Sequence, residues 1–205
     1  MSNNVNVINN AEKDLNVTVN NVDGNIQIII GKKKVDIDLL SLKAGELFEA
    51  NNIEYIVLEQ LERNKTAVIK KELLKDSIEF DSDNNNWKTS SIRKRLNDDY
   101  LKGIEETFGK DRIVEHTVDL LSLDGLDDYG TSTDKISLFS VDQYRKYRKV
   151  LGTNIRKAWW LITPDSTPSG YSAHYVRCVL FDGRAGCSDC RWGVLGVRPF
   201  FILQS

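Results

Sequence analysis

Period-two alternation of apolar and polar residues predicts β-strands in the first thirty residues. Residues 16–20 and 25–30 both alternate, and the Asp23-Gly24 pair between them is typical of a tight hairpin turn. A shorter alternation covers residues 5–7. Nine of the first 25 residues are asparagine and the first 40 contain no aromatic residue, so this segment has little with which to build a core.

We therefore expect residues 1–40 to form a β-rich or extended N-terminal arm. Such an arm is ordered best by packing on other copies of itself or on a partner, which predicts a homo-oligomer or an attachment segment. A frayed tail is the alternative interpretation.

From about residue 41 the pattern becomes that of a folded domain, which we assign to residues 41–205. Residues 54–59 and 66–70 predict a β-hairpin that turns at residues 63–65. Residues 111–118 predict a further short strand, followed by an acidic, glycine-containing loop.

Two helices are predicted in this domain. The first is capped by Thr89 or Ser90, because Ile92, Leu96 and Tyr100 follow at helical spacing. The second begins at the capping box Ser140–Gln143, with Phe139 and Tyr144 placed as a hydrophobic staple, and is predicted to end at Gly152. The basic residues of both helices are expected to be solvated; they are Arg93, Lys94, Arg95, Arg145, Lys146, Arg148 and Lys149.

The C-terminal part predicts further strands. Residues 158–163 indicate a buried strand, and the adjacent Trp159 and Trp160 must point to opposite faces of it, so the sheet should be covered on both sides. Residues 173–181 and 194–203 are the other candidates, and Pro199 suggests a bulge or an edge strand. The predicted fold class is α+β.

Charge and composition narrow the function classes. The net charge of −2 gives no basic field for nucleic acid, and no apolar run is long enough to span a membrane. The N-terminus lacks the features of a secretory signal peptide, and three cysteines do not make a disulfide framework. These features predict a protein of a reducing compartment, without nucleic-acid partners or membrane insertion.

Residues 158–203 have an unusual composition. They contain no Lys, Glu, Gln or Met, although the chain has 17, 11, 4 and 1 of these, and simple proportion would place about seven there. Buried strands avoid Lys, Glu and Gln in any case. However, the same stretch contains Asp and Arg residues that are not typical of a core, so burial alone does not explain the bias.

Four motifs occur in order along the chain, at residues 87–97, 137–144, 159–164 and 196–199. Together they resemble a widespread bacterial and phage domain family with a C-type-lectin-like fold. The resemblance implies an α+β domain with two helices packed on short antiparallel sheets. Some members of this family are variable proteins of diversity-generating retroelements, which display ligand-binding residues between the last two motifs. The resemblance therefore implies a cytoplasmic or virion-assembled protein that binds a protein or surface receptor.

Adenine-directed mutagenesis in such retroelements turns AAY codons into NNY codons, which cannot encode Lys, Glu, Gln, Met or Trp. The composition of residues 158–203 agrees with this restriction if the tryptophans, Trp192 included, are unmutated framework. The expected ligand-binding residues are Tyr171, His174, Arg177, Phe181, Arg184, Ser188, Asp189 and Arg191. The expected scaffold residues are Trp159, Trp160, Arg198 and Pro199.

Several alternatives stay open. A structural phage or cell-surface component would lack a diversified site. An enzyme similar to formylglycine-generating enzymes would need more than the lone Cys187–Cys190 motif, so we expect no catalysis and no cofactor. A zinc site could use His174, Cys178, Cys187 and Cys190, and an irregular calcium site could use Asp124, Asp127, Asp128 and Asp134. His116 is expected to be a hydrogen-bonded strand residue rather than a catalytic base.

Overall fold

The computed structural model describes residues 15–22, 25–32, 37–152 and 155–205, with side chains from residue 37 onward. The chain divides into two compact units, Met1–Val35 and Asp36–Ser205. The expected boundary at residue 40 thus lies inside the second unit, and Leu39 is already part of the core there.

Unit 1 contains one antiparallel hairpin of strands β1 (Leu15–Val22) and β2 (Asn25–Lys32). This confirms the two strands predicted from alternation. The paired register sets Val17 opposite Ile30 and Val19 opposite Ile28. Because successive strand residues alternate between faces, these four apolar residues share one face of the ribbon. The Asp23-Gly24 turn and the predicted strand at residues 5–7 lie outside the described residues.

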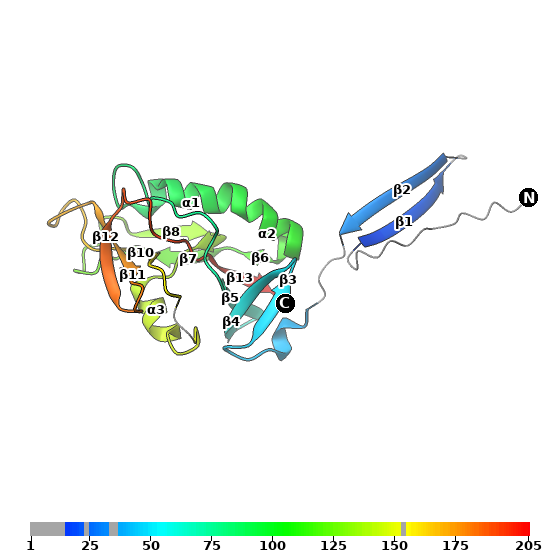
Figure 1. Ribbon diagram of the computed structural model, residues 1–205, viewed down its shortest axis with the longest axis horizontal. Helices are drawn as coiled ribbons and strands as arrows, with labels where there is room; N and C mark the ends of the chain where they lie inside the picture. Colours follow the sequence, from blue (N-terminus) through cyan, green and yellow to red (C-terminus); the bar gives the residue numbers. More distant parts are fainter. Residues whose placement is uncertain (1–14, 23–24, 33–36, 153–154) are drawn as a thin grey trace, which may run out of the picture. The chain divides into compact units, whose positions relative to one another are not determined.

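The main sheet of unit 2 brings together segments far apart in the sequence (Figure 1). Its strands run in the order β3-β4-β5-β13-β6, β9 also pairs with β13, and all neighbours are antiparallel. The bounds are β3 Leu47–Ala50, β4 Ile53–Leu61, β5 Lys65–Lys70, β6 Ile113–Val114, β9 Ile136–Ser137 and β13 Phe200–Gln204. The β4–β5 hairpin confirms the predicted one, and Arg63 and Asn64 turn it with positive φ angles.

Two smaller antiparallel sheets complete unit 2. One has the order β10-β11-β12, with bounds Trp159–Pro164, Tyr175–Val179 and Ala185–Asp189. The other pairs β7 (His116–Asp119) with β8 (Thr131–Asp134). The predicted strand at residues 111–118 is therefore two short strands, β6 and β7, which belong to different sheets.

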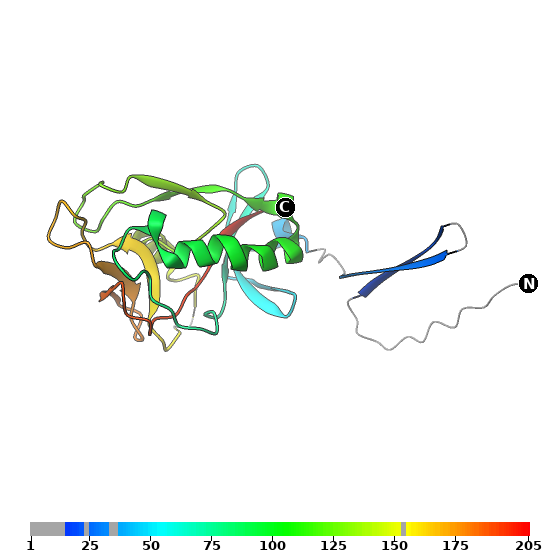
Figure 2. The same ribbon diagram turned by 90° about the horizontal axis from the view of Figure 1, so that it is seen from above.

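A continuous helix of 18 residues crosses unit 2 (Figure 2). It consists of α1 (Ser91–Arg95), a π-helical segment η3 (Leu96–Tyr100) and α2 (Leu101–Phe108). Ser90 caps it by accepting a hydrogen bond from the backbone N–H of Arg93, as predicted. At its other end, the ring of Phe108 packs edge-on against Tyr55 and Phe48 of the main sheet.

One expectation about this helix was wrong. Arg93 is not simply solvated, because its Nε donates to the buried carboxylate of Asp134 at 2.7 Å. The helix turns this residue toward the β7–β8 sheet, 41 positions away in sequence.

Helix α3 (Val141–Tyr147) has the predicted capping box, in which Ser140 and Gln143 satisfy each other's backbone N–H groups. It ends at Tyr147, five residues before the predicted end at Gly152. Gly152 has a positive φ angle of 67° and belongs to the following loop. Three 3₁₀ segments add single turns at Leu39–Ser41, Trp87–Thr89 and Lys110–Arg112.

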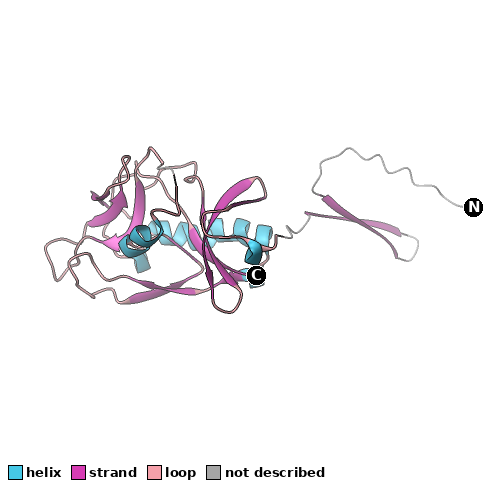
Figure 3. Cartoon of the chain, turned by 90° about the horizontal axis from the view of Figure 1, so that it is seen from below, coloured by secondary structure: helices cyan, strands magenta, loops and turns pink. Residues whose placement is uncertain are grey.

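Unit 2 is thus a mixed α+β structure of small antiparallel sheets with one long helix (Figure 3). Its core joins the main sheet to the three-stranded sheet, because Ile56, Ile69 and Phe200 share a buried cluster with Trp159 and Val179. In the described parts of the chain, no helix is both long and apolar enough to cross a membrane.

Candidate functional site

Two of the sequence motifs are joined by backbone hydrogen bonds and form a frame. The N–H of Trp160 donates to the carbonyl of Gly196 at 3.0 Å, and the N–H of Gly196 donates to Ala158 at 2.8 Å. A Cβ atom at Gly196 would lie 2.4 Å from Cδ1 of Leu73, so glycine lets the two segments approach under that side chain. The frame therefore fixes the positions of the two ends of the segment between residues 164 and 196.

The two tryptophans cover opposite faces of β10, which confirms the sequence-based expectation. Trp159 packs edge-on against Tyr144 of helix α3, with ring centroids 5.7 Å apart. Trp160 packs against Phe80 at 5.9 Å and donates its indole N–H to the carbonyl of Ile78. Both side chains are buried.

Arg198 ties the frame to the main sheet. Its Nε and Nη2 donate to the carbonyls of Lys70 and Lys71, at 2.9 and 2.8 Å, and its guanidinium lies 5.6 Å from the ring centre of Trp159. Only 3% of Arg198 is exposed, and this burial lowers its pKa to about 10. Pro199 precedes β13, an interior strand, so the expected bulge or edge position is not found.

Between the two frame segments, β11 and β12 form a hairpin that is exposed on part of one face. Tyr175 and Arg177 alternate along β11 with Val176 and Cys178, which are fully buried. Across the ladder, Tyr175 pairs with Asp189 and Arg177 with Cys187.

The eight expected ligand-binding residues differ in exposure. Tyr171, His174, Phe181, Arg184 and Arg191 are exposed, whereas Arg177 and Asp189 are half-buried. Ser188 pairs with Val176 on the inward face of the hairpin and is only 9% exposed. The structure therefore places Ser188 in the interior, where it does not contribute to the exposed surface.

The hairpin also separates the exposed residues into two groups. Phe181 and Arg184 lie in the turn that follows β11, whereas His174 and Arg191 lie at the opposite end, beyond the Tyr175–Asp189 pair. Five paired positions separate the ends, which is about 13 Å along the strand. A partner that contacts both groups must cover the length of the hairpin.

Three ion pairs neutralise the charges on this surface locally. Arg177 pairs with Asp165 at 2.7 Å, Arg184 with Asp182 at 2.7 Å, and Arg191 with Asp189 at 2.6 Å. The Arg191 guanidinium lowers the pKa of Asp189 to about 2. Asp165 also accepts a hydrogen bond from the hydroxyl of Tyr171, which anchors this exposed ring.

Exposed aromatic side chains concentrate on the same segment. Tyr171, Tyr175, Phe181 and Trp192 are 67%, 40%, 66% and 61% exposed, and every large aromatic residue this exposed in the described part of the chain lies here. Tyr175 was missed from sequence, although its alternation with Val176 could have revealed it. Trp192 was expected in the framework, but it lies in a surface turn.

The four residues of the suggested zinc site are not brought together. Cys187 is exposed on the face of the hairpin opposite to the buried Cys178, because the two positions are offset by one residue in the register. No group of three metal-binding side chains forms among the described residues. Burial raises the pKa of both cysteines of the CxxC motif, that of Cys190 to about 11 and that of Cys187 as well, which disfavours the reactive thiolates that a redox CxxC motif requires.

The acidic loop residues do not form the irregular calcium site either. Asp124 accepts from Ser122 two positions away, which is local turn chemistry, whereas Asp128 accepts from Ser169, 41 positions away. Asp134 is buried and accepts from the indole of Trp87. His116 lies in β7 with its Nε2 2.9 Å from the hydroxyl of Ser137, which confirms a hydrogen-bonded strand residue.

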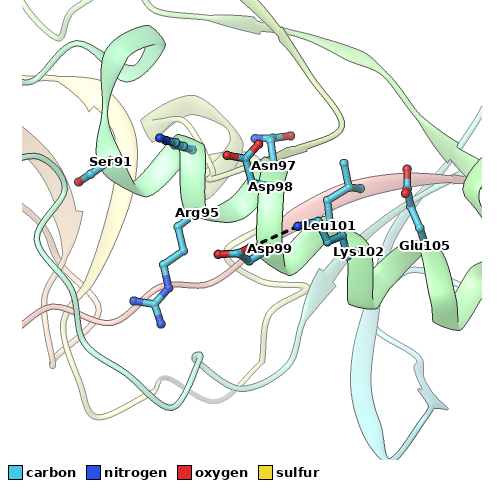
Figure 4. Close-up of a pocket in the computed structure, with 9 residues that line it drawn as sticks. Ser91, Arg95, Asn97, Asp98, Asp99, Leu101, Lys102 and Glu105 are labelled. Atoms are coloured by element: carbon cyan, nitrogen blue, oxygen red, sulfur yellow. Dashed lines mark hydrogen bonds and ion pairs between the residues drawn. The ribbon is translucent and has the colours of Figure 1, made fainter.

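A polar hollow of about 740 Å³ lies along the 18-residue helix (Figure 4). Three basic and three acidic residues line it, and none of its lining residues is buried. Lys102 pairs with Asp99 inside the hollow, and Arg95 and Glu105 pair with Asp76 and Lys135. Because the hollow has no buried polar group to hold a ligand, it is a less suitable site than the exposed surface of the β11–β12 hairpin, residues 171–192. The lining residues are Ser91, Lys94, Arg95, Asn97, Asp98, Asp99, Leu101, Lys102 and Glu105.

Comparison with known proteins adds no relative to this picture. The chain matches no family model, no curated protein and no solved structure.

Proposed function

We propose that unit 2 is a C-type-lectin-like scaffold that binds a protein or surface receptor through a diversified surface, as the variable protein of a diversity-generating retroelement. The observation that carries this proposal is the gathering of all four strongly exposed aromatic residues on one segment, between residues 171 and 192. Tyrosine and tryptophan supply large, rigid contact area in antibody paratopes, and a concentration of exposed aromatic rings on one segment is typical of an interaction surface.

The division between frame and exposed segment supports the same proposal. Trp159, Trp160 and Arg198 are held by buried contacts and main-chain hydrogen bonds. The segment between them returns to this frame and exposes side chains that the core does not require. A site of this kind keeps its backbone while its side-chain identities change.

The diversified interpretation predicts which positions tolerate mutation. We expect a library with NNY codons at Tyr171, His174, Tyr175, Phe181 and Arg184 to remain folded in most of its members, because these side chains are exposed. Folding is measured as protease resistance of the displayed full chain. Selection against hen egg lysozyme, an arbitrary protein probe, is expected to enrich binders.

A matched library tests whether the tolerance is specific to the surface. The same codons at Val176, Cys178, Val179, Ser188 and Cys190 should leave few folded members, because these residues are buried. Equal survival of the two libraries, or no lysozyme binders from the surface library, would refute a scaffold built for a variable surface. If the genome has no template repeat and no neighbouring reverse transcriptase, the retroelement part of the proposal is refuted, and the proposal of a binding surface stands.

We also propose that unit 1 mediates self-association through the apolar face of its hairpin. A two-stranded ribbon is marginally stable alone, and Val17, Val19, Ile28 and Ile30 share one face of it. The substitution Ile28→Lys in the full chain is expected to reduce the mass measured by light scattering to that of one chain. Gln27→Lys, on the opposite face, should leave the oligomer intact. A monomeric wild-type chain, or an oligomer that survives Ile28→Lys, would contradict the proposal.

A further inference from the structure

A cavity of about 170 Å³ lies beside helix α3. We call it the α3 cavity. Its described lining residues come from the helix and the loop after it, from β10, from the β11–β12 turn and from the last motif; they are Tyr144, Arg148, Leu151, Gly152, Ile155, Trp159, Asp182 and Arg198. Pockets for drug-sized ligands measure about 300–1,000 Å³, so this cavity suits a smaller molecule.

The α3 cavity contains a buried cation that makes no direct ion pair, although the Glu72 carboxylate is near enough to stabilise it electrostatically. Arg198 is 97% buried, and it forms no ion pair with any carboxylate of the described residues. Its Nε and Nη2 donate to backbone carbonyls, while Nη1 makes no hydrogen bond to a described residue. A buried guanidinium with a free donor edge favours an anionic acceptor, because desolvation of an unpaired charge is costly.

The walls of the α3 cavity are aromatic and carry one excess positive charge. The rings of Tyr144 and Trp159 meet edge to face, 5.7 Å between centroids. The guanidinium of Arg148 lies over the Tyr144 ring at 5.6 Å and adds a second cation. Asp182 is the one acidic lining residue, and both of its carboxylate oxygens accept from Arg184.

We propose that the α3 cavity binds a small organic acid, whose carboxylate contacts the Arg198 guanidinium and whose planar or apolar body lies against the aromatic wall formed by Tyr144 and Trp159. A carboxylate matches the planar donor edge of arginine, and the single excess positive charge of the lining matches a monoanion. This site does not depend on the proposed receptor-binding function, because its contacts with the acid come from Arg198, Tyr144 and Trp159, and Asp182 is the one lining residue that belongs to the exposed segment.

The test uses benzoate as the probe and benzamide as its uncharged analogue. In the full chain labelled with ¹⁵N, benzoate is expected to shift the indole signal of Trp159 in a saturable manner, while the exposed Trp192 reports no binding. Benzamide has nearly the same shape but no charge to meet Arg198, so its Kd should be at least about tenfold weaker. Equal binding of the two probes would overturn the proposal.

Variants that preserve Arg198 locate the binding without risking the fold. Leu151→Trp should fill the α3 cavity and abolish the benzoate response, whereas Leu121→Trp, at an exposed leucine elsewhere, should not. Arg148→Ala should weaken binding about threefold, and Lys149→Ala, at the next position in the turn after α3, should leave it unchanged. Benzoate binding that survives Leu151→Trp, or a Trp159 signal that does not respond in the wild-type chain, would show that the cavity is not a carboxylate site.

Discussion

Replacing Asp134 by alanine is expected to lower the free energy of unfolding by about 3–5 kcal/mol, the usual cost of removing one partner from a buried charged pair. Only 3% of Asp134 is exposed. Its carboxylate accepts from the indole of Trp87 at 2.7 Å, from Nε of Arg93 at 2.7 Å and from the hydroxyl of Ser132 at 2.9 Å. The substitution leaves three donors without their acceptor, two of them on the segment that begins the long helix.

The measurement is urea unfolding followed by far-ultraviolet circular dichroism, with Asp142→Ala as the control. Asp142 also pairs with an arginine, Arg145, but its side chain is 89% exposed and the pair lies along one turn of helix α3. Its replacement should change stability by no more than about 0.5 kcal/mol. Similar effects of the two substitutions would show that burial does not decide the contribution of Asp134.

Asp134 also shows where sequence reasoning reaches its limit. Capping boxes, hairpin turns and apolar alternation act over a few residues, so both helices and the β4–β5 hairpin were predictable. The acceptor role of Asp134 was not, because Trp87 and Arg93 lie 47 and 41 positions away and only the tertiary fold brings them together. In the sequence alone, nothing distinguished Asp134 from the other three acidic residues of its loop.

The exposed surface of the β11–β12 hairpin was also predictable only in part. The frame residues Trp159 and Trp160 were identified because two adjacent tryptophans in a strand require cover on both faces. Strand β12, with the sequence Ala-Gly-Cys-Ser-Asp, was missed because it contains no β-branched or aromatic residue. Without that strand, its pairing with β11 was unknown, and nothing indicated that Ser188 faces the interior.

Trp160→Ala is expected to lower the free energy of unfolding by about 3–5 kcal/mol, whereas Trp192→Ala should change it by no more than about 0.5 kcal/mol. The two substitutions remove the same atoms from the same C-terminal segment. Trp160 is fully buried against Phe80 and donates its indole N–H to Ile78, so its loss leaves a cavity and an unpaired carbonyl. Trp192 is 61% exposed in a turn.

Urea unfolding of the two variants therefore distinguishes a tryptophan that stabilises the frame from a tryptophan that is only exposed on the surface. A large loss of stability in Trp192→Ala would mean that this ring belongs to the frame, and the surface of four exposed aromatic residues would lose a member. A small loss in Trp160→Ala would mean that the frame does not depend on its buried tryptophans. We expect Trp160 to contribute to the free energy of unfolding and Trp192 to contribute little. A side chain that contributes little to folding can be replaced without loss of scaffold stability, so Trp192 can serve binding instead.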